Sequence, residues 1–160
     1  MIILGLDPGT AITGYGIVRK RLQRIDGVCY GTIRTEAHSP MGQRLNVIFN
    51  ELNDIIEKYR PDEVAIERLF FGRNTTTAIT VGQARGVLLL QAERHRLPIG
   101  EYTPMEVKQA LVGYGHADKK QVQYMVSDYL KLSEIPKPDD AADALAIAIC
   151  HAHHKQRRVQ

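Results

Sequence analysis

Residues 2–10 read Ile2-Ile3-Leu4-Gly5-Leu6-Asp7-Pro8-Gly9-Thr10, an apolar run that stops at a carboxylate and a turn. Short runs rich in branched apolar residues are typical of buried strands, and Pro-Gly is typical of turns. Residues 14–18 and 28–33 have the same character, so they predict two further strands. Three strands with short connections favour an antiparallel meander at the start of the chain.

Beyond Pro40 the apolar residues follow a helical spacing instead. They are Leu45, Ile48, Phe49, Leu52, Ile55, Ile56 and Tyr59. Intervals of three and four residues predict a helix with one buried face. The run Val64-Ala65-Ile66 then predicts a short buried strand that closes at Glu67. A right-handed crossover through the helix would place this strand beside residues 2–7.

The second half of the chain is mainly helical by pattern. Residues 76–95 predict a helix, and residues 99–102 predict a last strand. Capping signals open the helices that follow, namely Thr103 with Glu106, Asp118 with Gln121, and Asp139. The order βββαβαβααα predicts an α/β fold with a mixed five-stranded sheet flanked by helices.

The composition is that of one globular domain. The 160 residues are 44% hydrophobic and 24% charged, with no linker between periodic segments. We expect residues 1–155 to form the domain and residues 156–160 to form a basic tail that need not be ordered. Cys29 and Cys150 lack metal-ligand spacing, and no signal peptide or transmembrane run is present, so we expect reduced thiols and a cytoplasmic location.

Positive charge is clustered although the net charge is only +3. Residues 68–96 hold five arginines and one acid, and residues 151–160 hold three Lys or Arg residues and no acid. If metal ions occupied a group of acids, the remaining surface would be clearly cationic. An anionic polymer is therefore a sensible partner.

Four acids lie at the ends of apolar segments that are far apart in sequence. Asp7 and Glu67 close two strands, whereas Asp140 and Asp143 are three apart on one helix face. Such a four-carboxylate cluster would hold two Mg²⁺ or Mn²⁺ ions about 4 Å apart, a geometry suited to phosphodiester cleavage. The lack of a Cys/His ligand set disfavours zinc.

Each acid also has a simpler interpretation when it is taken alone. A strand-end carboxylate is more often a turn residue or loop cap, which applies to Asp7 and Glu67. Asp140 and Asp143 could be helix N-terminal acids favoured by the helix dipole. Asp143 fits this alternative least well, because it sits one turn inside an otherwise apolar helix.

Several segments taken in order resemble the RuvC family of bacterial Holliday-junction resolvases. The segments are Ile3-Leu4-Gly5-Leu6-Asp7-Pro8-Gly9-Thr10 with Thr13-Gly14-Tyr15-Gly16, Ala65-Ile66-Glu67 with Phe70-Phe71, Val81-Gly82-Gln83-Ala84-Arg85-Gly86, Val107-Lys108-Gln109, and Asp140-Ala141-Ala142-Asp143-Ala144-Leu145-Ala146. The match is colinear and spans nearly the whole chain. A strand and turn like residues 6–10 also occur in sugar kinases and actin-like ATPases, so the order of all the segments carries the resemblance.

The resemblance implies an RNase H-like fold and a Mg²⁺-dependent endonuclease of DNA recombination and repair. It implies a homodimer that makes paired symmetric nicks in a four-way DNA junction, with RuvA and RuvB as branch-migration partners. Four acids match the family's catalytic acids, namely Asp7, Glu67, Asp140 and Asp143. Asp139 adds an extra acid beside this motif, and the Asp-Ala-Ala-Asp spacing assigns Asp140 as the ligand, which leaves Asp139 as a helix cap or a group just outside the ligand set. Residues 76–95 carry apolar side chains on more than one face, which favours a partner helix in the dimer.

The resemblance also implies DNA contacts from lysines. Lys108 and Lys119 match basic residues near the cleavage site, and Lys119 could stabilise charge in the transition state. Lys120 adjoins Lys119, which leaves open which of the two faces the scissile phosphate. By composition alone, each lysine would be a solvated helix residue.

Further candidates follow the strand that ends at Glu67. Phe70 matches an aromatic residue that stacks on a junction base, although a core or interface role is equally consistent with the sequence. Arg73 and Asn74 are candidate phosphate contacts, and Arg85 is open between DNA contact and structural pairing. His116 and the histidines at 151, 153 and 154 could transfer protons, but the last three are better interpreted as part of a basic arm.

The sequence is compatible in part with three other functions. A sugar-kinase or actin-like ATPase would need two such domains around its nucleotide, and the chain has length for one. A noncatalytic junction-binding module is opposed by four intact carboxylates, which would repel DNA unless metal is bound. A related RNase H-like nuclease acting on RNA or replication intermediates stays open from sequence.

Overall fold

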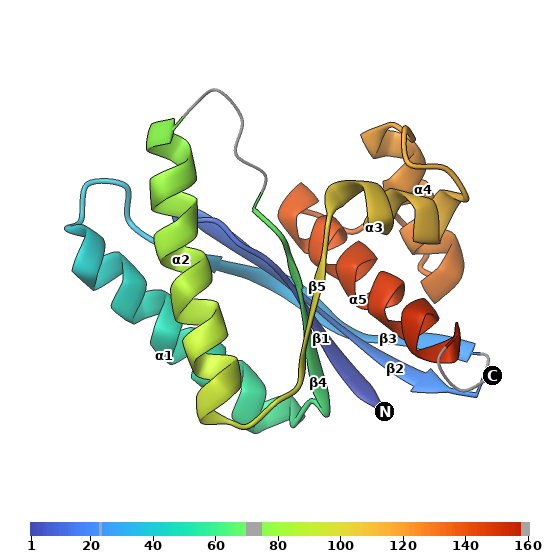
Figure 1. Cartoon of the computed structure of the whole chain (residues 1–160), viewed down its shortest axis with the longest axis horizontal. Coiled ribbons are helices and arrows are strands. Elements are labelled where there is room, and N and C mark those ends of the chain that lie inside the picture. Colours follow the sequence, from blue (N-terminus) through green and yellow to red (C-terminus); the bar gives the residue numbers. More distant parts are fainter. Residues whose placement is uncertain (23, 70–74, 158–160) are drawn as a thin grey trace.

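A computed structural model describes residues 1–22, 24–69 and 75–157, without the side chains of residues 75–76 and 155–157. Strands and helices follow the predicted order βββαβαβααα (Figure 1). The elements are β1 (Ile2–Asp7), β2 (Ile12–Arg21), β3 (Arg24–Arg34), α1 (Met41–Tyr59), β4 (Glu63–Glu67), α2 (Thr75–Arg94), β5 (Ile99–Tyr102), α3 (Pro104–Val112), α4 (Lys119–Leu130) and α5 (Asp139–Arg157).

The sheet is mixed and has the strand order β3-β2-β1-β4-β5. β1 pairs antiparallel with β2 and parallel with β4, and β4 pairs parallel with β5. The crossover through α1 therefore places β4 beside β1, as the sequence predicts. The carboxyl ends of these two strands meet at one edge of the sheet.

The β2–β3 hairpin is longer than its apolar residues suggest. β2 extends to Arg21 and β3 begins at Arg24, whereas the sequence predicted strands only over residues 14–18 and 28–33. The antiparallel ladder pairs Lys20 with Ile25 and Arg21 with Arg24. Backbone hydrogen bonds continue the strand pairing beyond the buried residues, where the side chains are no longer apolar and give no sign of a strand.

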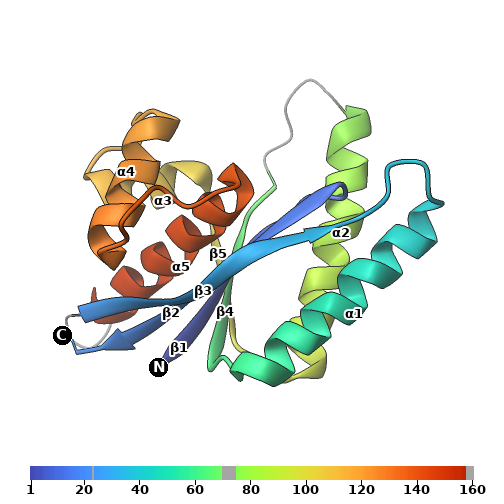
Figure 2. The same ribbon diagram turned by 180° about the vertical axis from the view of Figure 1, so that it is seen from behind.

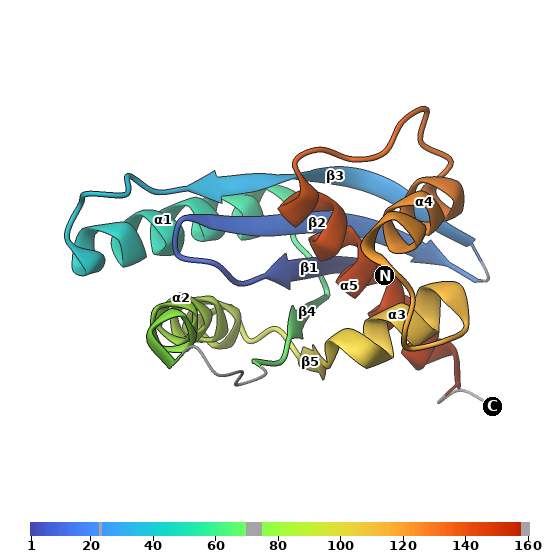
Figure 3. The same cartoon turned by 90° about the horizontal axis from the view of Figure 1, so that it is seen from above.

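Helices cover both faces of the sheet in separate groups (Figures 1 and 3). α1 and α2 lie on one face, and α3, α4 and α5 lie on the other. Because strand side chains alternate, Ile3 packs with α5 while Leu4 and Leu6 pack with α1 and α2. The same alternation directs Asp7 and Glu67 toward the face that α5 covers.

α5 packs closely on β1 and β2 because the strands lack side chains where it crosses. A Cβ added to Gly5 would lie 2.1 Å from the Ala144 carbonyl oxygen, and one at Gly14 would lie 2.0 Å from the Asp140 carbonyl oxygen. A Cβ at Gly16 would lie 2.7 Å from the Leu145 amide nitrogen. These distances are too short for any side chain, so the glycines set how near α5 approaches the sheet.

The C-terminal histidines belong to α5 and not to a separate arm, so that interpretation was wrong. His151 is 3% exposed, and its ring nitrogens lie 2.7 Å from the Tyr102 hydroxyl and 2.6 Å from Glu63 Oε2. This network links α5 to β4 and β5, and it explains why a polar residue is tolerated in the core. The helix continues to Arg157, two residues into the expected tail, and residues 158–160 lie outside the described part.

The remaining predictions concern the two cysteines and membrane-spanning segments. Cys150 is buried and Cys29 half-buried, and neither forms a disulfide. None of the helices over the described residues is long and apolar enough to cross a membrane.

Candidate active site

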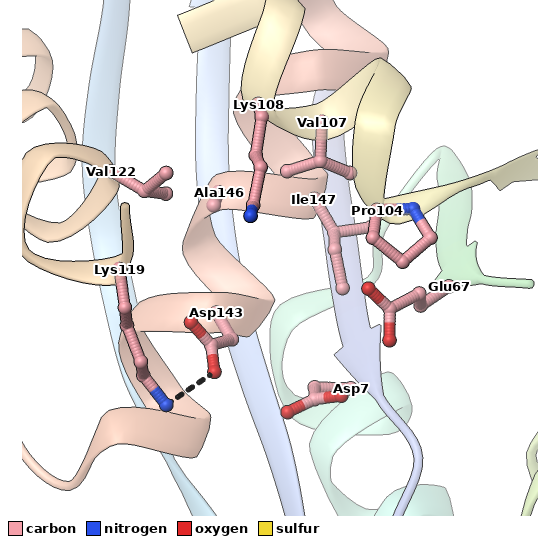
Figure 4. Close-up of a pocket in the computed structure, with 10 residues that line it drawn as sticks. All are labelled: Asp7, Glu67, Pro104, Val107, Lys108, Lys119, Val122, Asp143, Ala146 and Ile147. Carbon is pink, nitrogen blue, oxygen red and sulfur yellow. Dashed lines mark ion pairs between the residues drawn. The ribbon is translucent and has the colours of Figure 1, made fainter. Parts of the chain in front are cut away.

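Three of the predicted acids line one pocket at the carboxyl ends of β1 and β4. Leu6 pairs with Ile66 in the parallel ladder, so Asp7 and Glu67 extend from neighbouring strands. Asp143 enters from α5, and Figure 4 shows the three carboxylates directed toward the same space. The pocket has a volume of about 230 Å³ and is lined by Asp7, Glu67, Pro104, Val107, Lys108, Lys119, Val122, Asp143, Ala146 and Ile147.

Asp140 lies beside this pocket without lining it. Its backbone packs on Gly14, which is the register partner of Asp7, and its charge contributes to the raised pKa of Asp7. Over the described residues, no three His, Cys, Asp or Glu side chains are gathered closely enough to form a ready-made metal site. The fold thus brings three acids to the pocket and the fourth to its border.

The carboxylates raise one another's pKa values. Burial raises the pKa of Asp7 to about 8, and the charges of Glu67, Asp143 and Asp140 add to the effect. Burial, then the charge of Asp143, raises the pKa of Glu67. Burial also raises the pKa of Asp143, although Lys119 opposes the shift. The pocket therefore gathers carboxyl groups whose charged forms are disfavoured by burial and by one another.

Of the adjacent residues Lys119 and Lys120, only Lys119 lines this pocket. Its Nζ lies 3.1 Å from Asp143 Oδ2 and 3.2 Å from Asp139 Oδ2, at the first residue of α4. Burial lowers the pKa of Lys119, but the hydrogen bonds and charges of Asp143 and Asp139 outweigh it, so the pKa is raised. Lys119 therefore stays protonated and faces the carboxylates, as Figure 4 shows.

Capping boxes fix the helices that carry the two lysines. Thr103 accepts from the Glu106 amide and places α3, whose Lys108 points into the pocket (Figure 4). Asp118 accepts from the Gln121 amide at 2.8 Å and sets the start of α4. Both capping signals are confirmed, and each is worth roughly 1 kcal/mol.

Arg85 has a structural role in this chain. Its Nε donates to the Glu67 carbonyl oxygen at 3.2 Å, and its guanidinium forms an ion pair with Glu101. These contacts brace the end of β4 from which the Glu67 side chain projects. Phe70, Arg73 and Asn74 lie outside the described residues.

Two features of the site were not predicted in full. The sequence left Asp139 open between a helix cap and a group just outside the ligand set, and the structure makes it the first residue of α5, paired with Lys119. This pairing depends on tertiary contact and had no local signal. The packing role of Gly14 and Gly16 was missed, although two glycines on one side of a strand indicate close approach of another backbone.

The residues at the pocket fit a hard divalent cation by their chemistry. The possible donors there are carboxylate oxygens, which Mg²⁺ and Mn²⁺ prefer over nitrogen or sulfur. The raised pKa values of Asp7, Glu67 and Asp143 indicate a need for positive charge that such an ion would meet. Asp140 lies at the border of the pocket and would be the fourth carboxylate of the predicted set.

The chain is similar to known proteins over nearly its whole length. A family model described as crossover junction endodeoxyribonuclease RuvC matches residues 3–151. The chain is 60% identical over 153 residues to crossover junction endodeoxyribonuclease RuvC of Desulfitobacterium hafniense (strain DSM 10664 / DCB-2), covering 96% of this chain and 93% of that protein. It is also 60% identical to the RuvC of Heliobacterium modesticaldum, covering 96% and 94% of the two chains.

Solved structures extend the similarity to three dimensions. Thermus thermophilus RuvC is 37% identical with a TM-score of 0.91, covering 99% of this chain and 97% of that one. T. thermophilus RuvC in complex with Holliday junction substrate has a TM-score of 0.93 at 37% identity, with 99% and 96% covered. The yeast mitochondrial Holliday junction resolvase Ydc2, at 17% identity and a TM-score of 0.69 over 97% of this chain and 80% of that one, shares the fold. The chain therefore belongs to the RuvC family of crossover junction endodeoxyribonucleases, and its mixed sheet with flanking helices is the RNase H-like fold of the resolvases.

Proposed function

We propose that the protein resolves four-way DNA junctions by paired symmetric nicks, hydrolysing phosphodiester bonds with two divalent metal ions. The observation that carries this proposal is the convergence of Asp7, Glu67 and Asp143 on one pocket, opposite Lys119, in a chain of the RuvC family. The known complex of T. thermophilus RuvC with Holliday junction substrate supports the same substrate here. The nicks would serve homologous recombination and DNA repair.

Two Mg²⁺ ions, or Mn²⁺ in their place, would be held by four carboxylates, those of Asp7, Glu67, Asp140 and Asp143. When bound, the ions would supply positive charge at the scissile phosphate and make water more acidic. Asp7 and Glu67 are fixed by the sheet, whereas Asp140 and Asp143 are fixed by α5. The ligands would thus come from the sheet and from α5, which are packed against each other.

Lys119 and Lys108 would act on the DNA directly. The Lys119 ammonium group lies beside Asp143, where it would stabilise negative charge that develops on the phosphate. Asp139, which lies one turn before Asp143 on α5, also contacts the Lys119 ammonium group and would help to position it. Lys108 would bind a neighbouring phosphate. DNA contacts farther from the scissile phosphate would come from Lys120, Phe70, Arg73 and Asn74.

We infer a homodimer that uses α2 as its contact surface. Ile79 is 63% exposed and Leu90 is 53% exposed on this helix, although both are apolar. Gly86 lies between them with nothing within 4 Å of its Cβ position, so a partner helix could approach closely. A two-fold symmetric junction calls for two active sites related by the same axis.

Partners and location follow from family membership as proposals. RuvA and RuvB, the branch-migration proteins, would deliver the junction, and the cytoplasm is where bacterial DNA is found. Copurification of the full chain with RuvA and RuvB on junction DNA tests the first proposal. Recovery of the chain with junction DNA alone would contradict it.

A labelled synthetic four-way junction with Mg²⁺ tests the central proposal. The native chain should release paired nicked duplexes, while Asp7→Asn should bind the junction without cutting it. The substitution keeps the size of the side chain and removes the charge that attracts the ion. Equal cutting by the native chain and Asp7→Asn would reject the proposed chemistry.

A further inference from the structure

A second and larger pocket lies beside the β2–β3 hairpin and shares no residue with the carboxylate pocket. It has a volume of about 510 Å³. Its lining comes from the start of β2, the end of β3 and the first turns of α1: Ala11, Ile12, Arg34, Thr35, Glu36, Ser39, Gln43, Arg44 and Val47.

Arg44 is held in place by a relay of hydrogen bonds. Its Nε donates to Thr35 Oγ1 at 2.8 Å, and Thr35 Oγ1 donates to the Thr10 carbonyl oxygen at 2.6 Å. Among the residues that the structure describes, no other group accepts from Arg44. One edge of the guanidinium is therefore anchored, and its remaining N–H groups are available to a ligand at low entropic cost.

The relay connects this pocket to the turn that follows the catalytic strand. Thr10 comes three residues after Asp7, and its own hydroxyl donates to the Thr80 carbonyl oxygen of α2 at 2.7 Å. Figures 1 and 2 show the β1–β2 turn, the β3–α1 connection and the start of α2 at the same end of the molecule. The two pockets thus belong to the end of the fold that would face the DNA.

The residues that line this pocket are suited to binding phosphate, apart from one carboxylate. Arg34 is exposed and Arg44 half-buried, and Ser39 and Gln43 add uncharged hydrogen-bond donors. Glu36 is the one acid in the lining. Two guanidinium groups against one carboxylate leave net positive charge, and guanidinium binds phosphate oxygens through paired N–H groups.

We propose that this pocket binds a backbone phosphate of a junction arm, away from the phosphate that is cut. The inference rests on the proposed function and extends it by assigning Arg34 and Arg44 to DNA binding. Contacts of this kind position the duplex without reading its sequence, so they would help to align the scissile strand over the carboxylate pocket.

The test measures junction affinity against salt concentration in EDTA, where no cleavage interferes. Arg34→Ala and Arg44→Ala should each weaken binding roughly fivefold near physiological salt. Each should also reduce the magnitude of the slope of log K against log salt by about 0.9 per lost phosphate contact. Arg44→Lys should keep most of that slope, because the charge remains when the paired N–H groups are lost.

Two further variants separate a lost contact from a damaged fold. Arg21→Ala removes the same charge at the opposite end of the β2–β3 hairpin, so it should leave affinity and slope at native values. Glu36→Gln removes the opposing carboxylate and should tighten binding and steepen the slope, which misfolding cannot produce. These opposite signs are expected for a phosphate site.

The outcome that overturns the inference is equally specific. If Arg34→Ala and Arg44→Ala match Arg21→Ala in affinity and slope, and Glu36→Gln binds no more tightly, the pocket does not hold DNA phosphate. That result would leave the proposed function intact as long as the native chain cuts junctions. A native chain that neither binds nor cuts them would instead refute the proposed function itself.

Discussion

Asp7 is a buried carboxyl group surrounded by other acids. Burial and the charges of Glu67, Asp143 and Asp140 raise its pKa to about 8, so the metal-free carboxyl group is mostly protonated at neutral pH. A carboxylate kept in such a place costs free energy of folding unless a cation compensates it. A cation bound at the proposed metal site would supply this compensation.

The raised pKa of Asp7 predicts how stability depends on pH without metal. The folded pKa of Asp7 exceeds its unfolded value of 3.8, so its stabilising contribution is fully present below 3.8 and is lost as the pH rises through about 8. Between pH 5.5 and 8.5 in EDTA, the native chain should lose on the order of 2–3 kcal/mol more than Asp7→Asn. Denaturant unfolding of both chains at the two pH values measures the difference, and parallel curves would contradict it.

Metal binding should show the complementary dependence. Because Mg²⁺ competes with the proton on Asp7, stabilisation by Mg²⁺ should be greater at pH 8.5 than at pH 6.5. Thermal unfolding with Mg²⁺ and with EDTA at each pH provides the measurement. An equal Mg²⁺ effect at both values would show that Asp7 does not hold the ion.

Lys119 and Lys120 form a matched pair for testing charge at the phosphate. Only Lys119 lines the carboxylate pocket, so Lys119→Ala should reduce the rate of cleavage at saturating enzyme by about 100-fold, and affinity much less. Lys120→Ala removes the same charge one residue away and should lower the saturated rate far less. Single-turnover cleavage and junction binding separate the two effects, and similar losses in rate would remove Lys119 from the chemistry.

At the scale of elements, the site depends on how α5 lies against β1 and β2. Gly5, Gly14 and Gly16 leave room for its backbone, and His151 ties its far end to Glu63. One rigid helix thus carries two acids at one end and an anchor at the other. The position of the acids is therefore a property of packing along the whole helix.

Gly14→Ala tests this packing. A Cβ there would lie 2.0 Å from the Asp140 carbonyl oxygen, so the first turn of α5 must shift. We expect a loss of about 1–3 kcal/mol in stability and about 100-fold in cleavage, because small misplacements of catalytic groups are costly. Gly42→Ala in α1 meets nothing within 4 Å and should be neutral or slightly stabilising. Native activity in Gly14→Ala would argue against the packing role.

At the scale of the whole molecule, the helices on the two faces of the sheet contribute to different surfaces. α3, α4 and α5 build the carboxylate pocket, whereas α1 and α2 cover the opposite face and leave part of α2 apolar and exposed. A dimer through α2 would set two carboxylate pockets at a fixed separation. Paired nicking would then be a consequence of assembly.

Charge on the exposed face of α2 should dissociate this dimer. Ile79→Glu and Leu90→Glu place acids where the partner helix would pack, so light scattering should give a monomer mass. Paired nicks should give way to unpaired ones or to none. Tyr124→Glu, on a residue 64% exposed on α4, is the control and should stay dimeric. Dimers in all three variants would move the interface elsewhere.

Local sequence determined much of this protein. The apolar run of residues 2–6, the helical spacing from Leu45 to Tyr59 and the capping box at Thr103 are short-range signals, and each produced its element. Strand direction and the right-handed crossover then placed Asp7 beside Glu67. The elements follow from backbone sterics, hydrogen bonding and the period of apolar residues, which act within a few residues. The crossover follows from the handedness that strand twist imposes on the connection between parallel strands.

Other features were decided only by tertiary structure. Whether Lys119 or Lys120 faces the acids depends on the rotation of α4, and the pairing of Lys119 with Asp139 depends on how α4 meets α5. The burial of His151, the close approach at Gly14 and the Arg44 relay likewise join elements distant in sequence. Such contacts are set by the packing of whole elements, and the residues themselves look like ordinary surface or strand positions until the chain is folded.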